Sequence, residues 1–344
     1  MGGSMKRLEL AVVGCGEIAG YAALVSKLIP QIRLAACCDV DSARAQAFAR
    51  RHGIRQVFTD YADLLARGSF DSLYLAVPHD LHSPMILQAL EAGKPVLVEK
   101  PLARSLPEGL EIVEMAARRG VKVGVNYQYR YDSGCYALAR AVQSGSLGRV
   151  HSIRINVPWR RTQSYFDAAP WHKTLARSGG GTLLTQGSHF LDVALWALDE
   201  LPVSAVGYTA SPGFEVEVET LAHGILQTRG GTLVNIASTM VAAREQAVTI
   251  EVYGQTGTAI YHDLPFPSVK FVGARIKPQR PPGWGLHALQ RSLAGFARWV
   301  LEDDPFLIPA ASALPVLAAV DALYRAAQTG DITLAHNPFD EEKA

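Results

Sequence analysis

The sequence lacks the features that mark several large classes of protein. Cysteine is scarce, with only four residues in 344: Cys15, Cys37, Cys38 and Cys135. Their spacing forms neither a metal-ligand pattern nor a disulfide framework, which fits a reducing cytoplasm. The longest uncharged stretch, Pro305 to Val320, contains three prolines and is shorter than the roughly 20 apolar residues that span a bilayer. We therefore expect a cytoplasmic protein with no metal site and no membrane span.

The sequence also lacks an excess of either positive or negative charge. The 33 basic and 32 acidic residues give a net charge of +1 and are scattered, so nothing indicates a partner among nucleic acids or anionic membranes. The start carries no signal-peptide pattern, because Met5 to Leu8 leads directly into a strand pattern. We expect Met1–Ser4 to be an added remnant before a natural start at Met5. With 49% hydrophobic residues, the chain has the material for about two packed domains.

The first 125 residues alternate short apolar runs with capped amphipathic segments, which predicts βαβ units and a parallel sheet. Strands are expected at Leu8–Val13, Leu34–Cys38, Ser72–Ala76, Pro95–Val98 and Lys122–Val125. One helix is expected over Asp41–Gly53. A second should begin at the N-cap pair Ser83-Pro84 and end at Gly93, and a third should follow the capping box Ser105–Glu108.

After about residue 150 the pattern changes to alternating segments joined by glycine-rich turns, which indicates an antiparallel sheet with one packed face. These segments are Val150–Val157, Val203–Tyr208, Glu215–Leu226, Thr232–Met240, Ala247–Tyr253 and Thr258–Tyr261. Helices are expected at Leu183–Leu198, His287–Leu301 and Ser312–Gln328, and Pro265–Pro282 is expected to be a loop.

The segment from Gly14 to Ala19 is a G-x-G-x-x-A turn between a strand and a helix. Gly14 permits the tight turn, Gly16 lets the backbone approach a pyrophosphate, and Ala19 keeps the helix close to the sheet. Asp39 ends the second strand, where an acidic side chain accepts hydrogen bonds from the adenosine ribose and repels a 2′-phosphate. This pattern predicts NAD rather than NADP. The alternative, that Asp39 only caps the next helix, is weaker because Asp41 is better placed for that role.

Two further segments, Ala76–His82 and Ala92–Pro101, carry a resemblance to a known family. They are similar to the hallmark segments of the glucose–fructose oxidoreductase, inositol dehydrogenase and rhizopine catabolism (Gfo/Idh/MocA) family, and Glu99-Lys100-Pro101 is the most specific part. The resemblance implies an α/β protein with an N-terminal Rossmann domain at residues 5–126. It also implies a C-terminal α/β domain at residues 127–335, with an open, mainly antiparallel sheet and a last helix that could pack back on the first domain. Members mostly oxidise or reduce a hydroxyl carbon of sugars or cyclitols with NAD(P).

Lys100 and His189 are the candidate catalytic residues. Lys100 follows a strand at the carboxyl end of the parallel sheet, where it can share the proton of a substrate hydroxyl. In the family, an Asp-x-x-x-His segment faces the substrate. Here His189 keeps the histidine, whereas Thr185 stands at the aspartate position, which puts an inositol-type substrate in doubt. Pro101 could form a cis peptide bond that fixes the direction of Lys100.

The resemblance also points to a substrate loop. Aromatic residues Trp159 and Trp171 can stack on a sugar, while Arg160, Arg161 and His172 could clamp a carboxylate or phosphate. A solvated loop or subunit contact is the alternative reading. Arg130 matches an arginine near the family's cleft, and a structural ion pair explains it equally well.

The expected sites are as follows. Cofactor-binding residues are Gly14, Gly16, Glu17, Ile18, Ala19, Asp39, Pro78, His82, Glu99 and Lys100, although His82 is also suited to local packing. Substrate residues are Thr185, Gln186, Arg130, Trp159, Arg160, Arg161, Trp171 and His172.

We interpret the protein as an NAD-dependent dehydrogenase of a sugar or of an amino, uronic or nucleotide-linked sugar. Two alternatives remain: an NAD-assisted glycosidase and a non-catalytic NAD-binding regulator. An open sheet needs a cover for its second face, so a homodimer or homotetramer is expected.

Overall fold

The computed structural model describes residues 6–283 and 285–339, and Met1–Ser4 lie outside them. The chain divides into two compact units. Unit 1 comprises the residues up to Ala103, Glu111–Tyr131 and Pro282–Ala311, and unit 2 comprises Arg104–Leu110, Asp132–Pro281 and the residues from Ser312 onward. Of the two long C-terminal helices, Ala288–Glu302 belongs to unit 1, whereas the last helix, Leu314–Thr329, belongs to unit 2.

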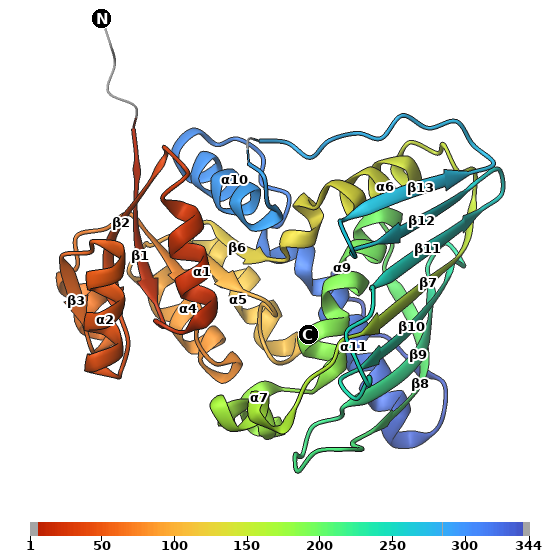
Figure 1. The fold of residues 1–344 in the computed structure, drawn as a ribbon, viewed down its shortest axis with the longest axis horizontal. Helices are drawn as coiled ribbons and strands as arrows, with labels where there is room; N and C mark the ends of the chain where they lie inside the picture. Colours follow the sequence, from red (N-terminus) through yellow and green to blue (C-terminus); the bar gives the residue numbers. More distant parts are fainter. Residues whose placement is uncertain (1–5, 284, 340–344) are drawn as a thin grey trace, which may run out of the picture. The chain divides into compact units, whose positions relative to one another are not determined.

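Unit 1 is built on a six-stranded parallel sheet in the order β3-β2-β1-β4-β5-β6 (Figure 1). Its strands are β1 (Leu8–Val13), β2 (Ile32–Cys38), β3 (Gln56–Phe58), β4 (Ser72–Leu75), β5 (Val96–Glu99) and β6 (Val123–Asn126). Its helices are α1 (Glu17–Ser26), α2 (Ser42–His52), α3 (Tyr61–Arg67), α4 (His82–Glu91), most of α5 (Leu106–Arg119) and α10 (Ala288–Glu302). The order reverses between β1 and β4, which creates the crevice where doubly wound folds bind ligands.

The parallel sheet confirms the predicted fold class, and the five expected strands are present. Burial explains the success, because β4, β5 and β6 are buried along their whole length and therefore read as unbroken apolar runs. The predicted N-cap of α4 is wrong. The helix begins at His82 after Leu81, and Ser83 lies inside it, because the short helical turn His79–Leu81 runs directly into it.

Unit 2 is built on an eight-stranded sheet in the order β13-β12-β11-β7-β10-β9-β8-β14. Its strands are β7 (Val150–Pro158), β8 (Pro202–Ala210), β9 (Leu221–Thr228), β10 (Leu233–Thr239), β11 (Thr249–Gly254), β12 (Thr258–His262), β13 (Ser268–Val272) and β14 (Thr333–Leu334). All neighbours are antiparallel except β7 and β10. The sheet is therefore mainly antiparallel, as expected.

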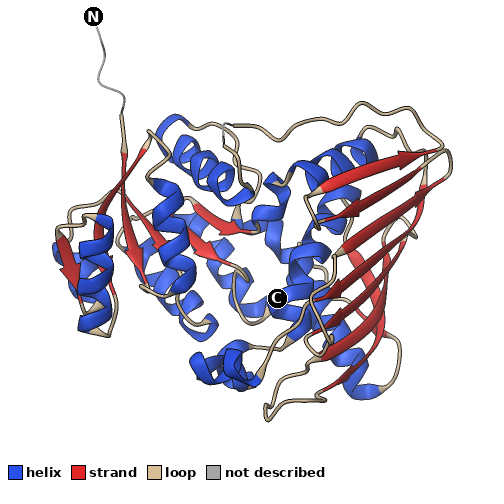
Figure 2. Ribbon diagram, viewed as in Figure 1, coloured by secondary structure: helices blue, strands red, loops and turns tan. Residues whose placement is uncertain are grey.

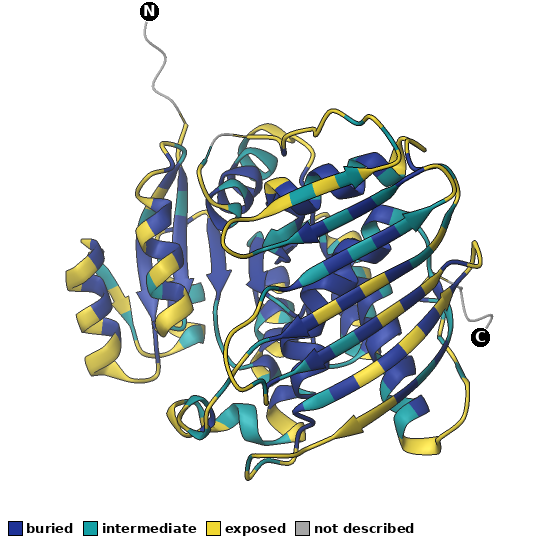
Figure 3. Ribbon diagram, turned by 45° about the vertical axis from the view of Figure 1, so that its right-hand side comes forward, coloured by how far each residue is buried: buried dark blue, intermediate teal, exposed yellow. Residues whose placement is uncertain are grey.

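Helices α6 (Ser133–Gln143), α9 (Ser188–Leu198) and α11 (Leu314–Thr329) pack against this sheet (Figure 2). The strands alternate between buried and exposed residues, which leaves one face outward (Figure 3). One stretch, Ala310–Thr329, passes a length-and-composition test for a membrane span with a mean hydropathy of 1.2, but 61% of it is buried. That degree of burial is typical of a core helix.

Three expectations for unit 2 need correction. Strand β9 begins at Leu221 rather than Glu215, because the preceding residues form a loop that buries Val218 and Glu219. Strand β13 lies inside the expected loop Pro265–Pro282. The expected helix Leu183–Leu198 begins with a π-helical turn at Leu183–Gly187 before α9 continues it.

Candidate active site

The glycine loop of unit 1 has the geometry that the sequence predicts. Gly14 adopts a φ of +82°, and a Cβ there would lie 2.2 Å from the carbonyl oxygen of Ala76, so only glycine fits. A Cβ on Gly16 would meet no atom within 4 Å. Gly16 is also the N-cap of α1 and provides no side-chain cap, so the backbone N–H groups of the first turn of α1 are left for an anion.

Asp39 lies at the carboxyl end of β2 and is 7% exposed. Its Oδ2 accepts the N–H of Cys15 at 2.8 Å, and its Oδ1 accepts the N–H of Asp41 at 2.9 Å. The Arg44 guanidinium lies 3.5 Å from Oδ1. Asp39 is therefore compensated by a neighbouring cation, which corrects the expectation of a lone repulsive charge. Asp41 caps α2, as expected, by accepting the N–H of Arg44 at 3.0 Å.

These features together fit a dinucleotide. The open space over Gly16 and the uncapped start of α1 suit a pyrophosphate, and the buried carboxylate of Asp39 suits a ribose. Ala19 is fully buried against the sheet, whereas Glu17 and Ile18 are exposed on the first turn of α1. Within the residues that the structure describes, no group of three or more His, Cys, Asp or Glu side chains is placed to hold a metal ion.

Lys100 follows β5 at the same edge of the parallel sheet as the glycine loop. The Lys100–Pro101 peptide bond is cis. His82 is completely buried, with Nδ1 2.8 Å from the carbonyl oxygen of Pro101 and Nε2 3.0 Å from that of Val77. Burial lowers the pKa of His82, against the opposing effect of the two carbonyl groups. His82 therefore ties the chain after Lys100 to the end of β4, while Pro78 starts the short turn His79–Leu81.

Glu99 belongs to a buried hydrogen-bond chain beside Lys100. Its Oε1 accepts bonds from the Tyr74 hydroxyl and from Asn126 Nδ2, the latter at 2.6 Å. Asn126 Oδ1 in turn accepts the hydroxyl of Ser292 on α10 at 2.8 Å. Burial, together with the nearby Glu99 carboxylate, raises the pKa of Tyr74 well above its usual value. This network joins β4, the carboxyl ends of β5 and β6, and α10 immediately before the lysine.

In unit 2, the π-helical turn and α9 carry the second candidate group. His189 is 5% exposed, and the ring of Trp159 meets it edge-on at 6.3 Å. The Thr185 hydroxyl donates to the carbonyl oxygen of Gly181 at 2.7 Å, four residues back in its own helix. Gln186 accepts the hydroxyl of Thr182 at 3.2 Å, whereas its buried Nε2 has no hydrogen-bond partner among the described residues. Gln186, rather than Thr185, is thus the residue with an unused donor.

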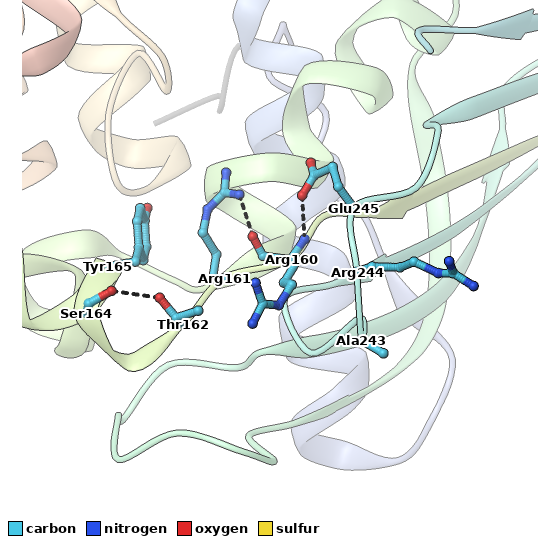
Figure 4. A pocket seen from close by; sticks show the side chains of 8 residues that line it. All are labelled: Arg160, Arg161, Thr162, Ser164, Tyr165, Ala243, Arg244 and Glu245. Carbon is cyan, nitrogen blue, oxygen red and sulfur yellow. Dashed lines mark hydrogen bonds between the residues drawn. The ribbon is translucent and has the colours of Figure 1, made fainter. Parts of the chain in front are cut away.

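The expected substrate loop forms part of a pocket of about 370 Å³ in unit 2 (Figure 4). The lining residues are Arg160, Arg161, Thr162, Ser164, Tyr165, Ala243, Arg244 and Glu245. The N–H of Arg161 donates to the carbonyl oxygen of Met240 at 2.9 Å, and the N–H of Arg160 donates to Glu245 at 3.2 Å, which joins the loop after β7 to the loop after β10. The guanidinium of Arg161 lies over the rings of Trp159 and Tyr165, and burial raises the pKa of Tyr165.

The other expected substrate residues do not line this pocket, although Trp171 and His172 lie beside it. Trp171 stacks on His172 at 3.6 Å, and the Nδ1 of His172 is 3.3 Å from the hydroxyl of Tyr165. Arg130, which is 3% exposed, donates to the backbone carbonyl of Leu307 at 2.9 Å within unit 1. Arg130 therefore holds a backbone segment in place.

Three residues at or beside these sites were not predicted from the sequence. Arg44 and Arg244 belong to chain segments that carry no motif of their own. Glu219 contacts the start of the π-helical turn from a position 38 residues further along the chain, so local spacing gave no signal for it.

Comparison with known proteins agrees with this architecture. Residues 8–127 match the family described as "Oxidoreductase family, NAD-binding Rossmann fold", and residues 135–260 match the "GFO/IDH/MocA C-terminal domain". Inositol 2-dehydrogenase of Rubrobacter xylanophilus is 31% identical over 266 residues, which are 75% of this chain and 72% of that protein.

Two further relatives act on or bind nucleotide-linked sugars. A dTDP-3,4-didehydro-2,6-dideoxy-alpha-D-glucose 3-reductase of Saccharopolyspora spinosa is 27% identical over 74% of each chain. The WlbA dehydrogenase of Bordetella pertussis, whose structure was solved in complex with NADH and UDP-GlcNAcA, is 26% identical in sequence to this chain. It superimposes with a TM-score of 0.84 over 96% of this chain and 100% of that chain.

Proposed function

The chain belongs to the Gfo/Idh/MocA family of oxidoreductases, and on that premise we propose that it transfers a hydride between NAD and a hydroxyl carbon of a sugar derivative. The observation that carries this proposal is the carboxyl edge of the sheet in unit 1. The open, uncapped start of α1 at Gly16, the buried Asp39 and Lys100 all lie along that edge.

The proposed roles follow from the chemistry of each side chain. NAD, when bound, supplies the hydride acceptor. Lys100 takes the proton of the substrate hydroxyl, and His189 relays it. Gln186 orients the sugar through its buried, unpartnered Nε2, because a buried donor gains most when a ligand supplies the missing acceptor.

We further propose that the substrate carries a carboxylate or a phosphate, as in uronic or nucleotide-linked sugars. Three guanidinium groups against one carboxylate line the pocket of Figure 4. Within the described part of the chain, the ion pairs do not include Arg160, Arg161 or Arg244. Figure 4 shows the side chain of Arg244 extended away from the other labelled side chains. Exposed arginine side chains change rotamer in nanoseconds, so they can turn toward an anion.

A turnover screen tests the proposal. The purified protein is mixed with NAD and with UDP-glucuronic acid, UDP-glucose, glucuronic acid or myo-inositol, and the nicotinamide absorbance is followed. We expect net reduction of NAD with at least one anionic sugar. Lys100→Met and His189→Ala should each lower kcat by about 10²–10⁴-fold, with little change in NAD affinity.

Substitution of the pocket residue tests the substrate class. Arg244→Gln should raise KM for the anionic substrate about tenfold or more, since a charged hydrogen bond contributes about 1.5–3 kcal/mol. KM for a neutral sugar should not change. Arg229→Gln is the matched control, because it removes an exposed arginine from the turn between β9 and β10.

Two alternatives predict different results in the same assay. An NAD-assisted glycosidase would cleave a glycosidic bond while its NAD returns to the starting state. A regulator would bind NAD without turnover. Unchanged kcat in Lys100→Met would contradict the proposed mechanism.

A further inference from the structure

The run Gly179-Gly180-Gly181 precedes the helical segment that carries Gln186 and His189. The backbone angle requires glycine at the first of these positions, and a close contact requires it at each of the other two. Gly179 has a φ of +78°. A Cβ on Gly180 would lie 2.2 Å from the hydroxyl of Tyr324, and a Cβ on Gly181 would lie 1.8 Å from the carbonyl oxygen of Glu219. The start of this segment is therefore pressed against Glu219 and Tyr324, both within unit 2.

Glu219 accepts three consecutive backbone N–H groups at this point. Its Oε2 accepts from Gly181 at 2.7 Å, its Oε1 from Leu183 at 2.8 Å, and its backbone carbonyl from Thr182 at 2.9 Å. A helix leaves its first N–H groups without partners inside the helix, and here no side chain of the segment caps them. A residue 38 positions away supplies the cap instead.

Tyr324 on α11 completes the arrangement, since its hydroxyl donates to Glu219 Oε1 at 2.9 Å. Glu219 is 7% exposed. Burial raises the pKa of Glu219, opposed by its hydrogen-bond donors, and burial with the Glu219 charge raises the pKa of Tyr324. The tyrosine therefore stays protonated and remains a donor. The carboxylate therefore accepts three donors, the N–H groups of Gly181 and Leu183 and the hydroxyl of Tyr324 on α11.

We propose that Glu219 is a positioning residue: its carboxylate, oriented by Tyr324, fixes the start of the segment Leu183–His189 and thereby the directions of Gln186 and His189. This inference rests on the proposed function for its catalytic consequence. Misplacing a catalytic group by about 1 Å costs up to about 10²-fold in rate, and Gln186 and His189 lie three and six residues after Leu183.

The test compares three variants with a control. Glu219→Gln is nearly isosteric, but it replaces one of the two accepting oxygens with an NH₂ group. That group cannot accept a backbone N–H, so one of the two carboxylate hydrogen bonds to the start of the segment is lost. Tyr324→Phe removes one donor and leaves the carboxylate. Glu200→Gln is the matched control, because Glu200 also accepts a backbone N–H, that of Gly230 at 3.1 Å, and a threonine hydroxyl, that of Thr228, in unit 2. Glu219→Asp keeps the charge and shortens the reach.

We expect kcat to fall about 10- to 100-fold in Glu219→Gln and less in Tyr324→Phe, with KM for NAD unchanged in both. Amide exchange within residues 181–189 should accelerate in Glu219→Gln, while exchange in β10 and α6 stays at the wild-type level. Glu200→Gln should change neither kcat nor exchange in this segment. For Glu219→Asp, both kcat and the exchange rate at 181–189 should lie between the values for the wild type and for Glu219→Gln.

The two readouts separate the possible failures. Wild-type exchange rates at 181–189 in Glu219→Gln, or a fall in kcat matched by Glu200→Gln, would overturn the positioning role. Exchange that accelerates without any loss of kcat would also overturn it. If the wild-type protein shows no turnover with any substrate, the proposed function fails, and the exchange data still decide whether Glu219 fixes the segment.

Discussion

At the scale of single residues, Arg44 changes the argument about cofactor choice. An isolated carboxylate at the end of β2 would repel a 2′-phosphate, but Arg44 lies 3.5 Å from Asp39 and is mostly exposed. A 2′-phosphate would meet both charges. The position of Asp39 still favours NAD over NADP, because its carboxylate is buried and held by the N–H groups of Cys15 and Asp41, whereas the Arg44 side chain is mostly exposed.

We therefore predict that NAD binds more tightly than NADP, and that Asp39→Ala narrows or reverses this preference by freeing Arg44 for the 2′-phosphate. Calorimetry with NADH and NADPH measures the effect. The double variant Asp39→Ala/Arg44→Ala should lose the gain in NADPH affinity that the single variant shows. Tighter binding of NADPH to the wild-type protein would contradict the assignment.

At the scale of elements, the sequence predicts well whatever depends on neighbouring residues. The buried strands, the glycine turn after β1 and the cap of α2 by Asp41 all have local signals. Strand β3 has three residues, too few to show a period, and the loop before β9 resembles a strand because it alternates while burying Val218.

The parts of the site that the sequence missed depend on contacts between distant segments. The carboxylate of Glu219 replaces a local N-cap for the segment that holds His189, and nothing near Gly181 indicates which residue does so. The π-helical turn at Leu183–Gly187 was likewise not predicted, because such turns are rare and the sequence here reads as an ordinary helix. The family resemblance pointed to Lys100 and His189 as candidates, with the position of Lys100 after a strand in agreement, but neither signal indicated the residues that hold them in place.

The contact of His82 with the chain after Lys100 gives a pH prediction for unit 1. Burial lowers the pKa of His82, so in the range below about pH 6.5 the unfolded chain binds a proton that the folded protein resists. Stability is then lost as the pH falls through that range. Urea unfolding at several pH values should show a smaller acid loss in His82→Gln than in the wild type.

His52 must be separated from this effect, because burial also lowers its pKa. A His52→Gln variant should remove its own share of the acid loss, which separates the contribution of His52 from that of His82. An identical acid loss in wild type and His82→Gln would show that His82 does not carry it.

At the scale of the whole molecule, the outward face of the sheet in unit 2 concerns assembly. Ala222, Leu226, Val234 and Ile236 are buried, so the alternating apolar positions mostly supply the core. The outward positions include Ile225 and Leu233, which are 40% and 47% exposed. Across the two strands Leu233 lies opposite Gln227, and Ile225 lies opposite Asn235. The outward face therefore combines apolar and polar side chains.

We predict a homodimer or homotetramer that covers this face, because exposed apolar residues on a flat sheet favour association. Light scattering at micromolar concentration should give a multiple of 37.1 kDa. Ile225→Lys should shift the mass toward the monomer, whereas Leu24→Lys, on the exposed side of α1, should not. A stable wild-type monomer would contradict the prediction.

The two candidate catalytic residues belong to different units, Lys100 to unit 1 and His189 to unit 2, so the proposal that they act together has to be tested by kinetics on the whole chain. If they form one proton-transfer unit, the double variant Lys100→Met/His189→Ala should lose little more kcat than the worse single variant, because residues that act as a unit are strongly non-additive. Steady-state kinetics of the wild type and three variants measures this coupling. Losses that simply multiply would instead mean that each residue acts alone. A rise in KM with unchanged kcat in His189→Ala would assign that histidine to substrate binding, leaving Lys100 as the group that takes the proton.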